Sequence, residues 1–354
     1  MQGTENTETS MNAADIKRLL AEAGAFRSAI AAAGEVDSAS VDSYRSWIAS
    51  GKHGEMAYLE KYDDLRSDPR LLLDGARSVI SCAFSYGGSF GSAGNTGGTG
   101  SAESAESAES AESADDYCGG LQWAEYALGD DYHDVVRKRL SAVAETIKTE
   151  TGAECRVCVD TAPLRERYWA VRSGLGFIGL NNQLIIPDGG SRFFLGEILT
   201  SLELEPDSPE GPSSCMGCGR CIAACPGKAL SIADDGNAEL DARKCLSYLT
   251  IEYRGELPPD TWLGSHVYGC DECQRVCPHN RQSPRTEIME FQARREITDL
   301  SAERIAEMSQ EEFSSTFRRS AIKRTKLAGL QRNALKIIQE RTLSQSPEDG
   351  VREE

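Results

Sequence analysis

In SCMGCGRCIAACPGKAL, Ser214–Leu230, four cysteines with the spacing C-x2-C-x2-C-x3-C precede a proline. This is the spacing of the bacterial ferredoxin run, in which three thiolates bind one [4Fe-4S] cluster and the fourth binds a second cluster. The alternative, a structural zinc site, uses two well-separated cysteine pairs around one tetrahedral ion. The spacing therefore favours iron–sulfur clusters over zinc.

A second run, GCDECQRVCPHN from Gly269 to Asn280, has only three cysteines before its proline. Its spacing matches the last three positions of the first run, so one ligand is displaced along the chain. Cys245 is the only nearby cysteine without an assignment. The sequence therefore predicts two clusters whose ligands cross between the runs: Cys215, Cys218, Cys221 and Cys277 for the first, and Cys225, Cys245, Cys270 and Cys273 for the second.

Length and composition indicate a globular protein. The chain has 354 residues, 40% of them hydrophobic, which is enough for about two to three domains. It has no apolar run long enough to span a membrane, and its start, MQGTENTETSMNAADIKRLL, lacks the basic and then apolar pattern of an export signal. We therefore expect a cytoplasmic protein that does not bind membranes, in which the twelve cysteines favour metal ligation over disulfides.

The charge of the chain changes sign along its length. The net charge of −18 argues against a protein that binds nucleic acid through a positive field over its whole surface. Six of the acidic residues, however, lie in residues 87–116, where tandem Ser-Ala-Glu triplets predict a disordered acidic insert. Residues 317–336, by contrast, are rich in Lys and Arg and contain no acid.

Periodicity and glycines indicate the order of the elements. Residues 12–60 are predicted to form helices, and 76–86 a buried strand. An amphipathic helix is predicted over residues 132–151, followed by strands within 154–160, 181–187 and 192–204. This strand–helix–strand succession predicts an α/β domain.

The same features divide the chain. The predicted units are a catalytic domain over residues 1–205, a ferredoxin-like domain over 206–283, a helical segment over 284–342 and a disordered tail over 343–354.

Beyond the cysteines, several stretches resemble the epoxyqueuosine reductases. They are HGEMAYLEK from His53, LRSDPRLLL from Leu65, YALGDDYHDVVRKRL from Tyr126, VDTAPLRER from Val159, GFIGLNNQLII from Gly176, RFFLGEI from Arg192 and SAIKRTKLAGLQRNA from Ser320. The resemblance implies an α+β fold: an α/β cobalamin-binding domain similar to that of reductive dehalogenases, then the ferredoxin-like domain and a helical segment. It also implies cobalamin, fed with electrons by two [4Fe-4S] clusters, as the cofactor.

The resemblance further implies a reaction and its partners. The enzyme would remove the epoxide oxygen from epoxyqueuosine at the wobble position of the tRNA anticodon stem-loop, giving queuosine. We expect a monomer that takes electrons from a low-potential donor such as flavodoxin or ferredoxin. Two other functions stay open at this point: a reductive dehalogenase, which usually carries an export signal, and a ferredoxin-type electron carrier without an enzymatic activity.

Asp160 corresponds to the proton donor of the family. Removing an epoxide oxygen requires an acid beside the cofactor, because an alkoxide is a poor leaving group. At the end of an apolar strand and beneath a corrin, this carboxyl group is expected to have a raised pKa. Alternation along CRVCVD places Asp160 on one face with Cys158 and opposite Cys155. The alternative is that Asp160 only caps a turn before Pro163.

The family's cobalamin contacts fall on the following positions of this chain: Arg66, Ala124, His133, Asp160, Leu184 and Leu195. Ala124 stands where other members can have Cys, and Leu180 stands where many have Lys, so any cationic role at Leu180 is lost. His133 could instead be a surface cap at the start of its helix.

The basic segment near the C-terminus is the predicted contact with tRNA phosphates. Its candidate residues are Arg318, Arg319, Lys323, Arg324, Lys326 and Arg332. The alternative is that these cations form an ordinary solvated helix face.

Cys245 gives the most direct test of the cluster assignment. Anaerobically reconstituted Cys245→Ser is expected to lose iron and sulfide, because the second cluster loses one of its four thiolates. Cys155→Ser and Cys82→Ser serve as controls that keep about eight irons per chain. An unchanged iron content in Cys245→Ser would remove this residue from the ligand set.

Overall fold

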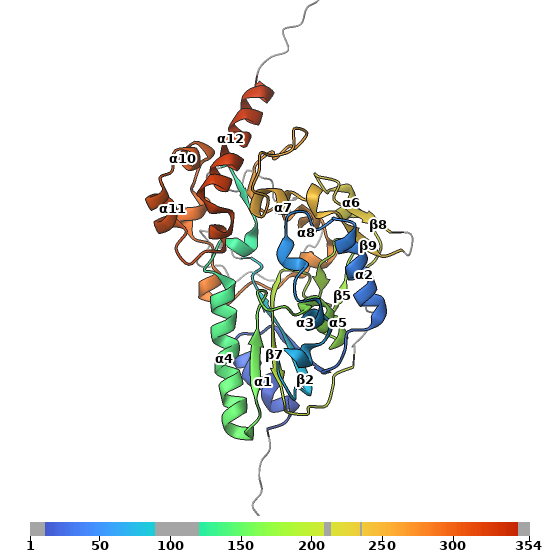
Figure 1. Ribbon diagram of the computed structural model, residues 1–354. Coiled ribbons are helices and arrows are strands. Elements are labelled where there is room, and N and C mark those ends of the chain that lie inside the picture. The colour runs from blue at the N-terminus through green and yellow to red at the C-terminus, as the bar shows by residue number, and fades with distance from the viewer. Residues whose placement is uncertain (1–10, 89–119, 209–213, 234–235, 346–354) are drawn as a thin grey trace, which may run out of the picture.

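The computed structural model describes residues 11–88, 120–208, 214–233 and 236–345. Nearly all of the predicted acidic insert and most of the predicted tail lie outside the described residues. Figure 1 shows a sheet with helices on both sides, below a smaller unit that carries the cysteine runs and the C-terminal helices.

The larger part of the fold is built on a four-stranded sheet with the order β1-β2-β7-β4. Neighbouring strands are antiparallel throughout. All eight residues of β2 are buried, so this predicted strand is confirmed as a central strand covered on both faces. The bounds are β1 Arg27–Ala32, β2 Ser78–Ser85, β4 Cys155–Cys158 and β7 Phe193–Thr200.

Helices cover the two faces of this sheet (Figure 1). On one face, α1 (Ala13–Glu22) and α4 (Tyr132–Thr151) pack their apolar residues against β2 and β7. On the other face, α5 (Glu166–Arg172) contributes Trp169 and Ala170. The predicted helix over residues 132–151 has the bounds of α4, which begins at the N-cap Asp131 and ends at Gly152 in the left-handed conformation.

The prediction of helices throughout residues 12–60 is wrong at β1. The segment RSAIAA has small residues that favour a helix locally, but it pairs with β2 along its whole length and buries Ile30 between the sheet and α1. Tertiary pairing therefore overrides propensity here. The α-helices within residues 12–60 are α1 and α2 (Ser38–Ala49), and α3 (Asp63–Ser67) follows this region.

The cysteine runs lie in a region of short elements. The strand expected within residues 181–187 is only the two-residue β6, paired with β5. The bounds of this region are β5 Phe177–Ile178, β6 Leu184–Ile185, α6 Arg220–Ala223, β8 Leu230–Ile232, β9 Ala238–Leu240, α7 Leu246–Ile251, β10 His266–Tyr268 and α8 Glu272–Arg275. The C-terminal helices are α9 Arg295–Thr298, α10 Ala302–Ala306, α11 Gln310–Thr316 and α12 Lys326–Gln345.

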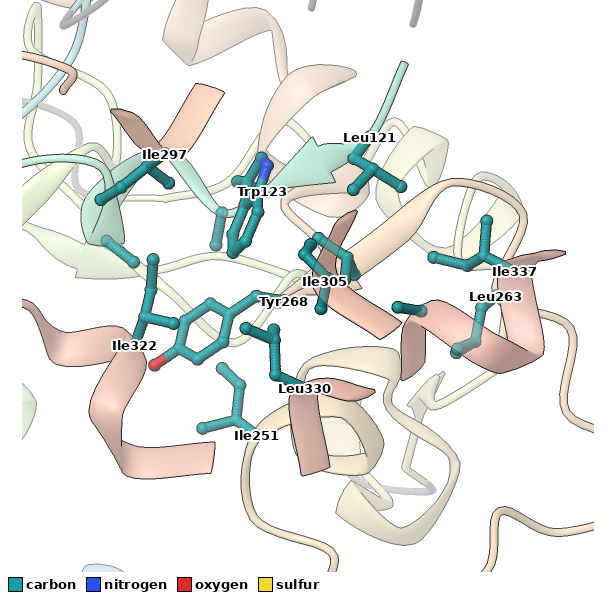
Figure 2. Packing of buried hydrophobic residues seen from close by; sticks show 14 of the residues in the cluster. Leu121, Trp123, Ile251, Leu263, Tyr268, Ile297, Ile305, Ile322, Leu330 and Ile337 are labelled. Carbon is teal, nitrogen blue, oxygen red and sulfur yellow. The ribbon is translucent and has the colours of Figure 1, made fainter. Parts of the chain in front are cut away.

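One core joins the three predicted segments of the chain. The short strand β3 (Gln122–Trp123) runs parallel to β10, and Figure 2 shows Trp123 and Tyr268 from these strands beside Ile322 and Leu330 of the C-terminal helices. All four side chains are almost completely buried. This core therefore holds the basic segment against the cysteine-bearing region.

Among the described residues, no helix combines the length and the apolar character needed to cross a membrane.

Candidate active site

The predicted cluster ligands line two separate cavities, four in each. Cys225, Cys245, Cys270 and Cys273 line the first cavity, and Cys215, Cys218, Cys221 and Cys277 line a smaller one. Cys225 and Cys277 each lie with the cysteines of the opposite run, as the crossed ferredoxin pattern requires. The local geometry of the runs is alike, because α6 and α8 each follow a residue in the left-handed conformation, Gly219 or Asp271.

The thiols of each set are arranged around a cavity. Within the described residues, no three or more His, Cys, Asp or Glu side chains converge closely enough to hold one metal ion. The cysteines surround cavities instead, and the backbone N–H of Ala229 points to Cys225 Sγ at 3.2 Å. Donors of this kind to cluster sulfurs are among the factors that set a cluster's potential.

The first cavity is lined by acidic and aromatic side chains as well as by the cysteines. It has a volume of about 320 Å³ and is lined by Leu184 and Leu195 as well as by Asp160 and Glu166. A third cavity borders it, with a volume of about 1030 Å³, and is called the second cavity from here on because the small one does not adjoin Asp160. It shares Tyr126, Tyr132, Asp160 and Glu166 with the first cavity. Asp160 therefore lies where the two cavities meet.

This cavity system fits most of the residues predicted to contact cobalamin. Its aliphatic and aromatic lining suits a large, flat macrocycle. Leu184 and Leu195 line the first cavity, Arg66 and His133 line the second, and Asp160 lines both. Leu180, where the family pattern is broken, lies instead in the smaller cavity of the first cluster.

Ala124 does not fit its predicted contact. It lines none of these cavities and is 2% exposed. Its N–H donates to the carbonyl of Tyr268, and its methyl group lies so close to Gly269 that a Cβ there would be 2.3 Å away. The structure thus gives Ala124 a packing role between β3 and β10.

Asp160 is held beside His133 by an unusual backbone conformation. Its φ is +46°, in the left-handed region, and β4 ends two residues earlier, at Cys158. The predicted alternation therefore does not extend to Asp160, whose Oδ2 lies 3.0 Å from Nε2 of His133 on α4. Cys155 and Cys158 do lie on opposite faces of the sheet, as predicted.

The imidazole of His133 is fixed on both sides. Its Nδ1 lies 2.7 Å from Oδ1 of Asp131, the N-cap of α4. Its ring stacks on Tyr132 at a centroid distance of 4.0 Å, and Tyr132 stacks in turn on Phe194 at 4.5 Å. His133 is thus a positioned partner of Asp160 as well as a residue of the helix start.

The charges of this pair differ from the sequence-based expectation. Burial lowers the pKa of His133, but the hydrogen bonds to Asp131 and Asp160 outweigh burial and raise it to about 9. The protein around Asp160 raises the pKa of its carboxyl group although the side chain is 56% exposed, but the hydrogen bond to His133 and the positive charge of His133 lower it below the ordinary value. The predicted upward shift is therefore wrong for this site without a bound corrin, and at neutral pH the pair holds one proton, on the imidazole.

Most of the basic segment borders the second cavity. Arg318, Arg319, Lys323, Arg324 and Lys326 line it and are exposed. Two of them have acidic partners. The guanidinium of Arg324 donates two hydrogen bonds of 2.8 Å to Glu252, and that of Arg319 lies 3.5 Å from Asp130.

Arg332 has a different role from the predicted one. Its guanidinium makes five hydrogen bonds, to the carbonyls of Leu249, Tyr253 and Gly255 and twice to the side chain of Asn333. A guanidinium has only five N–H donors, so none is left for a phosphate. Arg332 stabilises the turn after α7 instead.

Sequence reasoning did not single out Glu166. This residue lies in the stretch VDTAPLRER, and its Oε1 accepts the backbone N–H of Asp160. Its position six residues after Asp160, at the start of a helix, carries no signal of its own, because the contact depends on the left-handed turn between them.

Comparison with known proteins shows the same motifs in one family. The model described as Epoxyqueuosine reductase QueG, DUF1730 matches residues 66–161, and that described as 4Fe-4S double cluster binding domain matches residues 214–280. An epoxyqueuosine reductase of Cyclobacterium marinum is 38% identical over 291 residues, 81% of this chain and 84% of the relative. One of Gloeobacter violaceus is 38% identical over 330 residues, 91% and 94% of the two chains.

The chain belongs to the epoxyqueuosine reductase family.

Solved structures of epoxyqueuosine reductases agree with this assignment. The enzyme from Streptococcus thermophilus matches with a TM-score of 0.74 and 28% identity, over 93% of this chain and 81% of that one. A crystal structure of an epoxyqueuosine reductase with an epoxyqueuosine-modified tRNA stem loop has the same fold, with a TM-score of 0.75 at 24% identity over 92% and 80%. The predicted α+β fold is confirmed, and so are the predicted cofactors, cobalamin and two [4Fe-4S] clusters.

The pairing of His133 with Asp160 predicts an alkaline titration. By nuclear magnetic resonance, His133 of the cofactor-free protein is expected to titrate near pH 9, well above about 6.5 for an unperturbed histidine. Protonated His133 therefore contributes its full stabilisation below about pH 6.5 while Asp160 is ionised, and this contribution is lost as the pH rises through about 9. Asp160→Asn is expected to lower the pKa of His133, and an unchanged pKa in this variant would contradict the pairing.

Proposed function

We propose that this epoxyqueuosine reductase removes the epoxide oxygen of epoxyqueuosine at the wobble position of tRNA, giving queuosine. The observation that carries the proposal is the order of groups along the cavity system. Second-cluster cysteines lie at one end, Asp160 lies at the junction, and exposed cations lie at the other end. A plain electron carrier has no need of the acid or of the cationic end.

The chain's own residues divide the work of holding the cofactors. The two sets of four cysteines would hold the clusters, and Leu184, Leu195 and Arg66 would hold cobalamin in the adjoining cavities. When bound, these groups supply low-potential electrons to the epoxide. We expect the electrons to come from a donor such as flavodoxin or ferredoxin, and the enzyme to act as a cytoplasmic monomer.

Asp160 and His133 deliver a proton to the departing oxygen. Together they hold one proton at neutral pH, and the hydrogen bond of 3.0 Å between them lets it pass to Asp160 as negative charge develops on the oxygen. Asp160 lines both cavities, whereas His133 lines only the second. Asp160 is therefore the group that contacts the substrate, and His133 positions Asp160 and reprotonates it.

The anticodon stem-loop would bind at the cationic end of the second cavity. Arg318, Lys323 and Lys326 are exposed there, and within the described residues their side chains have no hydrogen-bond or ion-pair partner. Tyr58 and Tyr62 line the same cavity and are 44% and 60% exposed. Cations can contact phosphates while exposed aromatic rings stack on unpaired bases, which is how proteins bind single-stranded loops of RNA.

The lysines of this surface can be tested through salt dependence. The double variant Lys323→Ala, Lys326→Ala is expected to bind the stem-loop more weakly and to reduce the slope of log affinity against log salt by about two, one for each lost phosphate contact. Lys148→Ala, a change on the far end of α4, is the matched control and should keep the wild-type slope. Equal slopes in all three proteins would place the RNA elsewhere.

The reaction itself is tested anaerobically, with cobalamin-loaded protein, a low-potential reductant and tRNA carrying epoxyqueuosine. The wild type is expected to form queuosine. Asp160→Asn should keep its cobalamin and both clusters but lose turnover by about a hundredfold to ten-thousandfold, the usual range for a positioned acid. Full cofactor occupancy with a near wild-type rate would end the proton-donor role of Asp160.

A further inference from the structure

The proposed reaction needs more protons than the Asp160–His133 pair holds. Deoxygenating an epoxide breaks two carbon–oxygen bonds and forms a carbon–carbon double bond, with two electrons taken up from the clusters through the cofactor. The oxygen leaves as water, so two protons are consumed in each turnover. The pair holds one of them, and the second comes from solvent or from another acid that can reach Asp160 or the oxygen.

Glu166 has the position that such an acid requires. It is the first residue of α5 and lines both cavities, as Asp160 does. Its Oε1 accepts the backbone N–H of Asp160, so the carboxyl group of Glu166 lies against the backbone of Asp160. Of the acidic residues in the described part of the chain, only Asp160 and Glu166 line both cavities.

The surroundings of Glu166 keep its carboxyl group protonated. Burial and the negative charge of Asp160 raise its pKa to about 8. Charged and titratable groups from several elements face Glu166. They are Asp160 in the turn after β4, Tyr132 and His133 on α4, Arg167 on α5, Cys158 on β4 and Glu197 on β7. The hydrogen bond from the backbone N–H of Asp160 and the positive charges of Arg167 and His133 lower the pKa of Glu166 but do not cancel the effect of burial.

A further buried carboxyl group, that of Glu197, interacts with Glu166 and is also neutral. It is completely buried on β7, and both its carboxyl oxygens lack a hydrogen-bond partner within the described residues. An isolated carboxylate in such a place would cost far more free energy than a neutral acid, and burial raises the pKa of Glu197 well above its ordinary value. Glu197 therefore adds no negative charge that would compete for the proton of Glu166.

We propose that Glu166 is the second proton source of the reaction and that its carboxyl group reprotonates Asp160 within a turnover. The inference rests on the proposed function. Asp160 gives the first proton, drawn from His133, to the oxygen as the first carbon–oxygen bond breaks. Glu166 then transfers its proton to Asp160, which passes it to the same oxygen, and water leaves. Glu166 is left as a carboxylate and regains its proton from solvent through the open second cavity.

The alternative is that Glu166 only holds the turn of Asp160 in place. Glu166→Gln separates the two roles, because the amide oxygen still accepts the N–H of Asp160 while the exchangeable acid is lost. Glu150→Gln, an exposed change on α4, is the control for loss of one carboxyl group.

Two measurements decide between these roles. In infrared difference spectra of the cofactor-free protein, wild type minus Glu166→Gln should show a protonated carboxyl band at pH 7 that disappears as the pH rises through about 8. In single-turnover assays with reduced, cobalamin-loaded enzyme, the wild-type rate should fall through the same pH range. Glu166→Gln should be slower by about a hundredfold at pH 7 and lack this pH step, with cobalamin and iron content unchanged. Glu150→Gln should behave as wild type.

Several results would overturn the proposal. One is a Glu166→Gln enzyme with the rate and pH profile of wild type, and another is a slow variant whose rate returns when excess cobalamin restores occupancy. The absence of the protonated carboxyl band from the infrared difference spectrum would also overturn the proposal. Failure of the wild type itself to convert the modified tRNA is a different result, because it would reject the proposed function while the infrared result on Glu166 still stands.

Discussion

The parallel pairing of β3 with β10 is the constraint on which the site depends. The carboxyl ends of parallel strands lie at the same edge of a sheet. Here the chain that follows each of the two strands carries part of the candidate active site. β3 continues through a 3-10 helix, Glu125–Ala127, into α4 with His133, and β10 continues into Cys270 and Cys273. The N–H of Glu125 donates to Asp271 at 2.7 Å and ties the two continuations together just past the strands. The second-cluster cysteines and the acidic residues Asp160 and Glu166 therefore line one cavity.

The same core sets the position of the basic segment. Tyr268 of β10 donates its hydroxyl to the carbonyl of Ala321 at 3.0 Å, next to Lys323 and Arg324. Ile322 is completely buried in the core that Figure 2 shows. Exposed cations are thus held on a rigid support at the mouth of the second cavity, although the net charge of the chain is −18. A local positive surface on an acidic protein favours binding at one place over binding to nucleic acid everywhere.

How much the sequence could predict depends on how local the cause is. Cysteine spacing predicted a ligand grouping that the two cavities match, because the ligation chemistry fixes the spacing. The apolar periodicity of residues 132–151 predicted α4, because this periodicity is also a local property of the chain. By contrast, β1 forms because β2 lies beside it, and Arg332 is saturated because distant carbonyls converge on it. The charge states of Asp160 and Glu166 depend on a left-handed turn and on His133 from another helix, and no pattern in the chain encodes these.

The cavity proposed for cobalamin is lined by the second-cluster cysteines and by Asp160. Pulsed electron paramagnetic resonance of cobalt(II) in the cobalamin-loaded protein tests this most directly, because a nearby paramagnetic cluster speeds the relaxation of the cobalt spin. We predict fast relaxation when the clusters are reduced, and slow relaxation in a Cys245→Ser protein that retains cobalamin and the first cluster. Equal relaxation in the two proteins would show that the corrin does not lie beside the second cluster.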